Sequence, residues 1–228
     1  MNQLIPRTFT AGDILNIFIE QHRLTAPLDP EADPDVKLSF DTTVEEWRSA
    51  NNLLSWQPLS RFLNQEFQIV VSKKEWESVL TPPSDRTLQE VCEMISRHYR
   101  AEDISIVKLR GEVCIKATLF LTLKKYLRKR QAEVSEVKPS SLLSPYLENY
   151  FSEMIEQITI LSRGRKIIDH IEIKRKKPGF WNYINIFDKE RYTFSTGEVR
   201  TFRDLILKMA EVNNTALCKN NDHYAPES

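Results

Sequence analysis

The sequence contains few glycines and none of the glycine-rich loops that hold nucleotide phosphates. There are 5 glycines among 228 residues, whereas average composition would give roughly 16. The patterns G-x-G-x-x-G and G-x-x-x-x-G-K, whose small residues let the backbone approach a phosphate, are both missing. This shortage argues against the dinucleotide-binding and P-loop classes of protein.

Cysteine and histidine are also scarce, and they are scattered along the chain. The cysteines are Cys92, Cys114 and Cys218, and the histidines are His22, His98, His170 and His223. No C-x-x-C or H-x-x-x-H pair offers the ligand spacing of a zinc site. We therefore expect no metal and no cofactor, and the wide cysteine spacing is typical of a reduced, cytoplasmic protein.

Long apolar runs are missing as well. Polar residues interrupt every apolar stretch before it reaches the about 20 residues that a membrane-spanning helix needs. The N-terminal stretch MNQLIPRTFTAGDILNIF has neither the basic start nor the apolar centre of a signal peptide. We expect no membrane partner, and the sequence gives no indication of the oligomeric state.

The apolar content indicates a folded protein, and the charged residues divide it into two halves of opposite net charge. Apolar residues make up 41% of the chain, which is enough for a packed core. Residues 1–100 hold 10 Lys and Arg against 15 Asp and Glu, whereas residues 101–228 hold 22 against 17. Two domains that attract each other, separate partners for each half, or chance would each explain the asymmetry.

Helical patterns dominate the first hundred residues, and an acidic, proline-rich loop at 25–41 interrupts them. The expected helices lie at 11–22, 42–54, 59–67, 73–80 and 86–98. Pro58 is expected to break the helix near Gln57, because a residue before proline disfavours the helical conformation.

From residue 101 the pattern is mixed. A short strand is expected at 103–111, helices at 112–130 and 146–161, strands at 166–176 and 183–195, and a last helix at 203–211. The turn STGE is expected to join the second of those strands to VRTF. The sequence therefore predicts a mainly helical α+β protein. We expect an acidic helical domain at 1–100, a basic α+β domain with a small antiparallel sheet at 101–212, and a flexible tail at 213–228.

One sequence pattern typical of a helix start occurs twice in the chain. RTLQEVCEMI at 86–95 and RTFRDLILKM at 200–209 share a threonine cap, an acidic residue three positions later and the same apolar spacing. Upstream, VVSKKEW (70–76) resembles IFDKERY (186–192). Either the chain contains a divergent repeat that begins near residue 134, or two buried helices converged. Superposing 60–98 on 176–212 would separate these explanations.

The segment at 59–98 resembles the later half of an acyl-carrier-protein domain. The positions that fit the family pattern are Leu63, Glu66, Phe67, Ile69, Thr87, Leu88, Val91 and Ile95. The resemblance implies a small helical bundle. In that family a serine carries the phosphopantetheine, but Leu53 stands at its place here and Asp169 in the second copy. The resemblance therefore extends to shape and not to the carrier chemistry.

Cys114 is the one candidate nucleophile, because it stands where a strand meets a helix. A thiol at a helix N-terminus can have a lowered pKa and attack an electrophile. His98 and His170 are the nearest bases in the sequence. The alternative is that Cys114 is a small buried hydrophobic residue. No catalytic residue is assigned, and an enzyme is the less favoured class.

A basic stretch followed by aromatic residues is the strongest signal outside the core. Seven Lys and Arg lie between 163 and 177, followed by Phe180, Trp181 and Tyr183. Such a segment can bind phosphates and stack on bases. The alternative is a solvated hairpin, and a pI near 6.9 argues against a dedicated nucleic-acid binder.

The sequence favours a non-enzymatic protein-interaction or adaptor module, because abundant charge and several tryptophans accompany no catalytic cluster. Nucleic-acid binding through 163–183 and a thiol-dependent enzyme using Cys114 are the alternatives. The candidate contact residues are Trp47, Trp56 and Trp76 on the acidic side, and Lys174, Arg175, Lys177 and Trp181 on the basic side.

Overall fold

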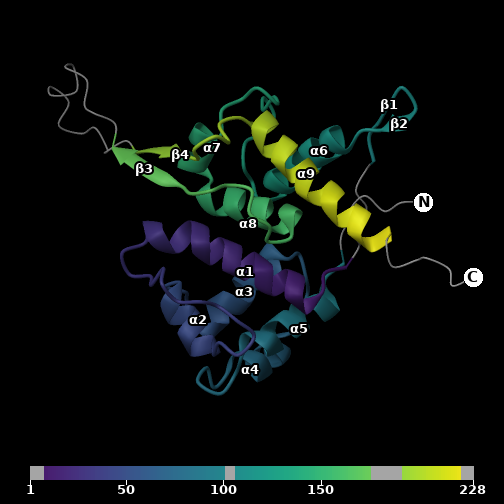
Figure 1. The fold of residues 1–228 in the computed structure, drawn as a ribbon. Helices are drawn as coiled ribbons and strands as arrows, with labels where there is room; N and C mark the ends of the chain where they lie inside the picture. Colours follow the sequence, from purple (N-terminus) through teal and green to yellow (C-terminus); the bar gives the residue numbers. More distant parts are fainter. Residues whose placement is uncertain (1–7, 101–105, 176–191, 222–228) are drawn as a thin grey trace, which may run out of the picture.

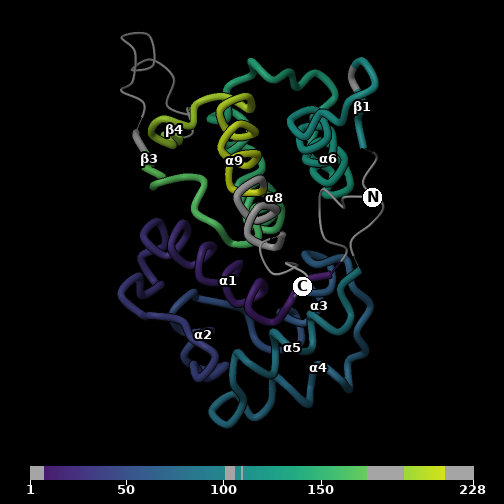
Figure 2. Tube along the Cα trace, turned by 45° about the vertical axis from the view of Figure 1, so that its right-hand side comes forward, coloured from purple at the N-terminus to yellow at the C-terminus, as the bar shows by residue number. Residues whose placement is uncertain are grey.

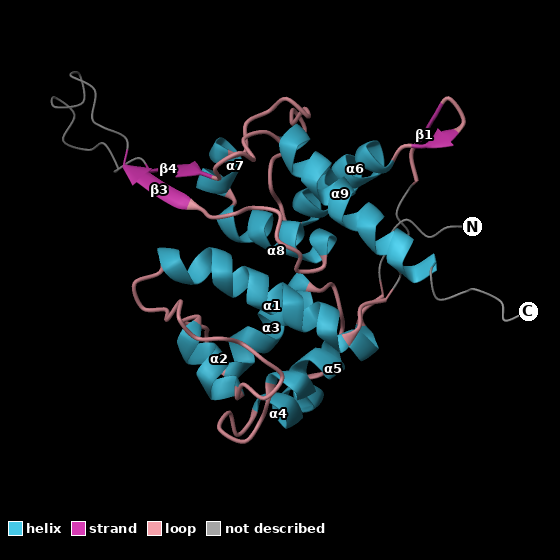
Figure 3. Ribbon diagram, viewed as in Figure 1, coloured by secondary structure: helices cyan, strands magenta, loops and turns pink. Residues whose placement is uncertain are grey.

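The computed structural model describes residues 8–100, 106–175 and 192–221. Over these residues the protein is mainly helical, with two short antiparallel hairpins, so the predicted α+β class is confirmed. Helices of the first half lie on one side of the molecule and helices of the second half on the other (Figure 1). The strands lie at its periphery (Figure 3).

The first half consists of helices that begin at polar caps. Their bounds are α1 (Ala11–Thr25), a 3-10 turn η1 (Ala26–Leu28), α2 (Val44–Ala50), α3 (Trp56–Glu66), α4 (Lys73–Leu80) and α5 (Leu88–His98). Capping boxes start α1 at Thr10, α2 at Thr43 and α4 at Ser72. Each box satisfies backbone N–H groups that have no partner inside the helix. The starts expected at residues 11 and 73 are confirmed.

Three expected boundaries in this half are wrong, the first being the end of the helix expected at 11–22, which continues to Thr25. The helix expected at 42–54 ends at Ala50, because Asn52 has a positive φ of 49° and turns the chain. The break expected before Pro58 does not occur, since α3 begins at Trp56 and includes the proline. Pro58 lies in the first turn, where a missing N–H removes no hydrogen bond.

The second half mixes helices and hairpins. Its elements are β1 (Lys108–Leu109), β2 (Glu112–Val113), α6 (Ile115–Lys129), α7 (Ser144–Asn149), α8 (Phe151–Ser162), β3 (Glu172–Arg175), β4 (Tyr192–Ser195) and α9 (Phe202–Asn221). Lys108 pairs with Val113 in the first hairpin, and Gly111 makes its turn with a φ of +89°. In the second hairpin, Glu172 pairs with Ser195 and Arg175 with Tyr192.

Several expected boundaries in this half are also wrong. The helix expected from residue 112 starts at Ile115, because the residues before Cys114 pair in a hairpin. The helix expected at 146–161 is two helices, since Tyr150 leaves the helical region with φ −139° and ψ 47°. The strand expected to pair with VRTF pairs with β3 instead. The last helix continues past Glu211 to Asn221, into the segment expected as a tail.

Buried apolar side chains form two clusters, one in each half. The first cluster runs from Phe9 to Tyr99, and the second from Leu119 to Ala210. Two residues cross over, because Leu24 of α1 belongs to the second cluster and Ile160 of α8 to the first. The helices α1 and α8 therefore join the two halves along their length (Figures 1 and 2).

The backbones of α1 and α8 approach closely at Gly164, just after α8 ends. Gly164 has a φ of +69°, and a Cβ built on it would lie 2.1 Å from the carbonyl carbon of Asn16. Its N–H donates to the carbonyl of Thr159 at 2.8 Å, which closes the last turn of α8. Only glycine fits this conformation and this contact.

A hydrogen-bonded bridge links the segment before α2 to the start of α5. Val44 N–H donates to the carbonyl of Arg86 at 2.8 Å, and Leu88 N–H donates to the carbonyl of Thr42 at 2.9 Å. The next N–H, at position 89, donates to the carbonyl of Phe40 at 3.1 Å. The bridge holds the two helix starts side by side.

The same bridge recurs between the segment before α7 and the start of α9. Leu143 N–H donates to the carbonyl of Arg200 at 2.9 Å, and Phe202 N–H donates to the carbonyl of Ser141 at 3.1 Å. The next N–H, at position 203, donates to the carbonyl of Pro139 at 2.7 Å. The two halves therefore share this bridge as well as the capped helix that follows it.

The upstream part of the expected repeat is wrong. Trp76 lies in helix α4, whereas Tyr192, its expected counterpart, lies in strand β4. Residues 176–191, which contain the rest of the second copy, lie outside the described residues. The expected superposition of 60–98 on 176–212 therefore fails before α5 and α9, and the common motif is the bridge with the helix that follows it.

Candidate functional site

The tryptophans expected to contact a partner belong largely to the first core. Trp76 is 0% exposed and offers no contact surface, whereas Trp47 is 4% exposed and borders only the cleft described below. The indole Nε1 of Trp76 donates to Oδ1 of Asn64 at 3.0 Å, which satisfies its polar group in the core. Trp56 is half-buried, with Nζ of Lys73 5.6 Å from its ring centroid.

The first cations of the basic segment are used inside the molecule. Arg163 donates to the carbonyl of Thr8 at 2.8 Å, and Arg165 donates to the carbonyl of Val212. Lys166 Nζ lies 3.1 Å from a carboxylate oxygen three residues later. Arg163 and Arg165 thus hold chain segments together, whereas Lys166 is exposed and makes a local ion pair.

The other residues expected on the basic side cannot be placed in the same way. Lys174 and Arg175 lie on β3, but their side chains are outside the described part of the structure. Lys177 and Trp181 belong to 176–191, which is outside it altogether.

Cys114 is the N-cap residue of α6 and is half-buried. The histidines considered as its bases each face a carboxylate: His98 Nε2 lies 3.7 Å from Glu75, and His170 Nε2 lies 3.3 Å from Glu172. Among the described residues, no hydrogen bond joins Cys114 to a histidine. The arrangement therefore lacks the thiol and imidazole pair that activates a catalytic cysteine.

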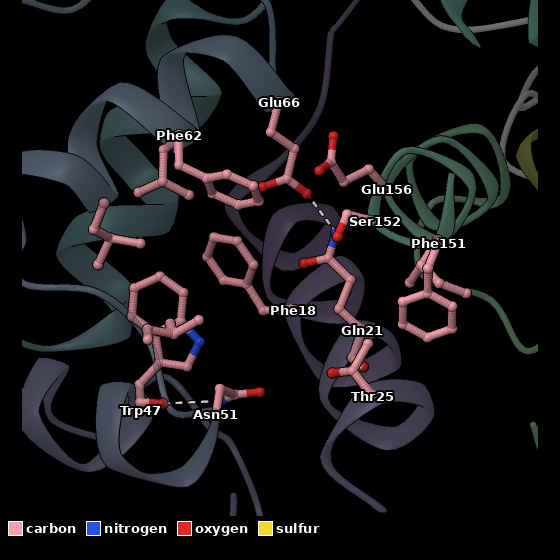
Figure 4. Close-up of a pocket in the computed structure, with 14 residues that line it drawn as sticks. Phe18, Gln21, Thr25, Trp47, Asn51, Phe62, Glu66, Phe151, Ser152 and Glu156 are labelled. Atoms are coloured by element: carbon pink, nitrogen blue, oxygen red, sulfur yellow. Dashed lines mark hydrogen bonds between the residues drawn. The ribbon is translucent and has the colours of Figure 1, made fainter. Parts of the chain in front are cut away.

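A cleft of about 200 Å³ lies between the two halves, and it was not expected from the sequence. It is bounded by α1, α2 and α3 on one side and by the start of α8 on the other (Figure 4). Its apolar lining residues are Phe18, Trp47, Leu53, Leu59, Phe62, Leu63, Phe151 and Ile155. Leu53, at the place of the carrier serine, is half-buried in this lining.

Polar groups form one end of the cleft. Figure 4 shows Glu66 from α3 and Gln21 from α1 pointing toward each other, with Glu156 reaching the same place from α8. The amide nitrogen of Gln21 donates to Oε1 of Glu66 and to Oγ1 of Thr159, the latter at 3.2 Å. This network joins α1, α3 and α8 at the junction of the two cores.

Glu156 is paired, whereas Glu66 is only partly satisfied. Nη2 of Arg130, just after α6, lies 2.9 Å from Oε2 of Glu156 and 3.1 Å from its Oε1. Glu66 is 1% exposed, and its Oε2 has no hydrogen-bond partner among the described residues. Nε and Nη1 of Arg130 also have no partner there among the described residues. The polar end of the cleft is therefore incompletely hydrogen-bonded, and buried unpaired polar groups are destabilising.

Burial controls the charge of these carboxyls. The pKa of Glu66 is raised to about 8, mainly by desolvation and also by the charge of Glu156, while the hydrogen bond from Gln21 and the charge of Arg130 act in the opposite direction. Desolvation also raises the pKa of Glu156 to about 7, against the attraction of Arg130. Arg130 is close to both carboxyls but pairs directly with Glu156. Glu66 therefore has the higher pKa and is the carboxyl that holds a proton near neutral pH. A neutral carboxyl donates and accepts hydrogen bonds, and an ionised one pairs with a cation.

Sequence reasoning missed this pair because its members are far apart and lie among core residues. Glu66 continues the buried stripe of Leu59 and Leu63 on α3, and Glu156 interrupts the apolar run of α8. A carboxylate at a core position of an amphipathic helix is rarely buried without a partner. A glutamate at a core position of a helix was therefore the feature of the sequence that could have indicated this site.

Among the described residues, no group of three or more His, Cys, Asp and Glu side chains could hold a metal ion. In the same part of the chain, no helix has both the length and the apolar character needed to cross a membrane. Comparison with known proteins finds no significant match to a family model, a curated protein or a solved structure.

Proposed function

We propose that this chain is a cytoplasmic, non-enzymatic interaction module that binds one side chain of a partner protein in the cleft between its two halves. The observation that carries the proposal is the cleft itself, with aromatic and aliphatic walls and a polar end. Apolar walls with a few convergent polar groups are the usual composition of a binding site.

The size of the cleft supports a side chain as the occupant. Its volume of about 200 Å³ is below the range of roughly 300–1,000 Å³ that is typical of sites for drug-sized ligands. Protein interfaces commonly obtain most of their affinity from single side chains that fill desolvated pockets. A partner residue inserted among Phe18, Phe62 and Trp47 would have this kind of contact.

The proposal is tested by selecting displayed random peptides on the full chain and counter-selecting on Ser152→Phe. Ser152 is exposed at the rim of the cleft, so a phenyl ring there fills the opening without entering the core. We expect enriched peptides that bind the wild type and lose at least about tenfold in affinity with Ser152→Phe.

Two variants serve as controls. Ser152→Ala keeps the cleft open and should bind like the wild type. Ser140→Phe adds the same ring at an exposed site before α7 and should leave binding unchanged. The proposal fails if no selected peptide distinguishes wild type from Ser152→Phe, or if Ser140→Phe weakens binding equally.

A further inference from the structure

The polar end of the cleft has more negative than positive groups. Glu66 from α3 and Glu156 from α8 meet there, and Glu153 adds a negative charge that acts on Glu156. Arg130 at the end of α6 pairs with Glu156, and Arg100, just after α5, lines a second small pocket with Glu66. From α1 the facing side chain is the uncharged amide of Gln21. Arg130 pairs directly with Glu156 and reaches Glu66 only through its charge, so the carboxyl of Glu66 has no direct ion pair among the described residues.

Glu66 lines the cleft, and one oxygen of its buried carboxyl has no hydrogen-bond partner among the described residues. Glu66 is 1% exposed, so water reaches it poorly. The amide nitrogen of Gln21 is engaged with Glu66 and Thr159, which leaves the amide oxygen of Gln21 as a second acceptor in the lining. Acceptors gathered in an apolar cleft favour a ligand with donors at its tip.

The remaining walls suit an aliphatic stem. Phe18, Phe62 and Trp47 present ring surfaces to the cleft (Figure 4). A lysine side chain buries its methylene stem along apolar surface and carries three donors on a compact ammonium group. Aromatic faces add a favourable interaction with the cation.

We propose that the residue bound in the cleft is a lysine of the partner, with its ammonium group against Glu66. This inference rests on the proposed function and specifies the residue that the cleft recognises. The ammonium group supplies the direct ion pair that Glu66 lacks among the described residues, and its stem fills the space between the aromatic rings.

Binding of a cation is coupled to loss of a proton. With the cleft empty, burial raises the pKa of Glu66 to about 8, so near neutral pH the carboxyl is mostly neutral. An ammonium group binds the ionised form, and it must displace the proton below that pH. Affinity for a cation therefore rises with pH, whereas affinity for a neutral analogue does not.

The test is a titration of the full chain with pentylammonium and with 1-pentanol, followed by NMR chemical shifts. Pentylammonium reproduces the lysine side chain, and 1-pentanol has the same stem without the charge. We expect pentylammonium to bind at least about tenfold more tightly at pH 8.5, because it gains the charge-assisted contact with Glu66. Between pH 6.5 and 8.5 its affinity should increase by roughly ten- to thirtyfold.

The variant Glu66→Gln keeps the shape of the side chain and removes its negative charge. It should bring the affinities for pentylammonium and 1-pentanol close together and leave only the smaller pH dependence that comes from Glu156. Glu77→Gln, at an exposed position on α4, is the matched control and should behave like the wild type.

Each outcome has a distinct meaning. Equal binding of both probes to wild type, unaffected by Glu66→Gln, overturns the lysine assignment but leaves the cleft as a binding site. Tighter binding of pentylguanidinium than pentylammonium also overturns it, in favour of arginine. Binding of none of these probes removes the cleft as a recognition site, and the proposed function with it.

Discussion

At the scale of single residues, Glu66 is the most consequential side chain of the structure. It occupies a position in α3 where the helix pattern calls for an apolar residue, and it meets a second acid from α8. A buried carboxyl with an incomplete set of partners lowers stability in its ionised form. Its presence at the cleft therefore links the stability of the protein to pH.

Replacing Glu66 with glutamine should stabilise the protein above neutral pH. The pKa of Glu66 is raised to about 8 in the folded state, against a model value of 4.5. Between these values the folded state holds a proton that the unfolded state has lost, so stability decreases as pH rises through this window. Glu66→Gln removes this pH-dependent loss of stability. We expect the free energy of unfolding to increase by on the order of 2–4 kcal/mol at pH 8 and to change little at pH 4.5.

Urea unfolding of wild type, Glu66→Gln and Glu77→Gln at several pH values from 4.5 to 8 measures this difference. Glu77→Gln should follow the wild type, because that carboxylate is exposed. A gain for Glu66→Gln that is the same at every pH would contradict the assignment of a raised pKa, since an ordinary packing effect does not depend on protonation.

At the scale of elements, the sequence predicted the first residues of α1 and α4, at Ala11 and Lys73, correctly. Starts depend on local chemistry, because Thr10 and Ser72 reach acidic residues three positions later. The division of one expected helix at Tyr150 has no such local marker. The pairing of β3 with β4 and the approach of α8 to α1 depend on residues far apart in sequence, so local patterns could not reveal them.

Gly164 shows how strongly one position controls the packing of two helices. Gly164→Ala should destabilise the protein by at least about 2 kcal/mol, because alanine is strained at a φ of +69° and its Cβ meets the backbone of Asn16. Gly12→Ala is the matched control, since its nearest neighbour would lie 3.7 Å away at Thr10 and no positive φ is involved. Guanidinium unfolding should show a large loss for the first variant and at most a small change for the second. Similar midpoints for both would refute the close approach of α8 and α1.

At the scale of the whole molecule, the charge asymmetry and the mixed second half predicted two regions, and buried residues form two clusters. The sequence did not predict that these clusters exchange residues through α1 and α8. Nor did it predict the cleft, because its lining comes from four helices on both sides of residue 100. Apolar periodicity shows that a helix face is buried, but it does not show which partner covers that face.

The exchange of residues between the clusters predicts that the two halves unfold together. Leu24 lies on α1 in the first half, but it is 2% exposed within the second cluster. Leu24→Ala should therefore reduce the free energy of unfolding by about 2–4 kcal/mol. It should lower the midpoint of one unfolding transition shared by both halves, and not the midpoint of one of two separate transitions. Tryptophan fluorescence reports mainly on the first half, where Trp47, Trp56 and Trp76 lie. Far-UV circular dichroism reports on the helices of both halves.

We expect the fluorescence and circular dichroism midpoints of Leu24→Ala to fall by the same amount. Leu54→Ala, at a side chain that is 59% exposed, is the control and should leave both near the wild-type values. If the circular dichroism transition splits while the fluorescence midpoint stays in place, the halves are independent domains. In that case the cleft would lie between bodies that move separately, and Glu66 would not be held against Glu156. Coincident transitions would instead mean that a ligand in the cleft stabilises the whole chain, because it contacts both halves of one cooperative unit.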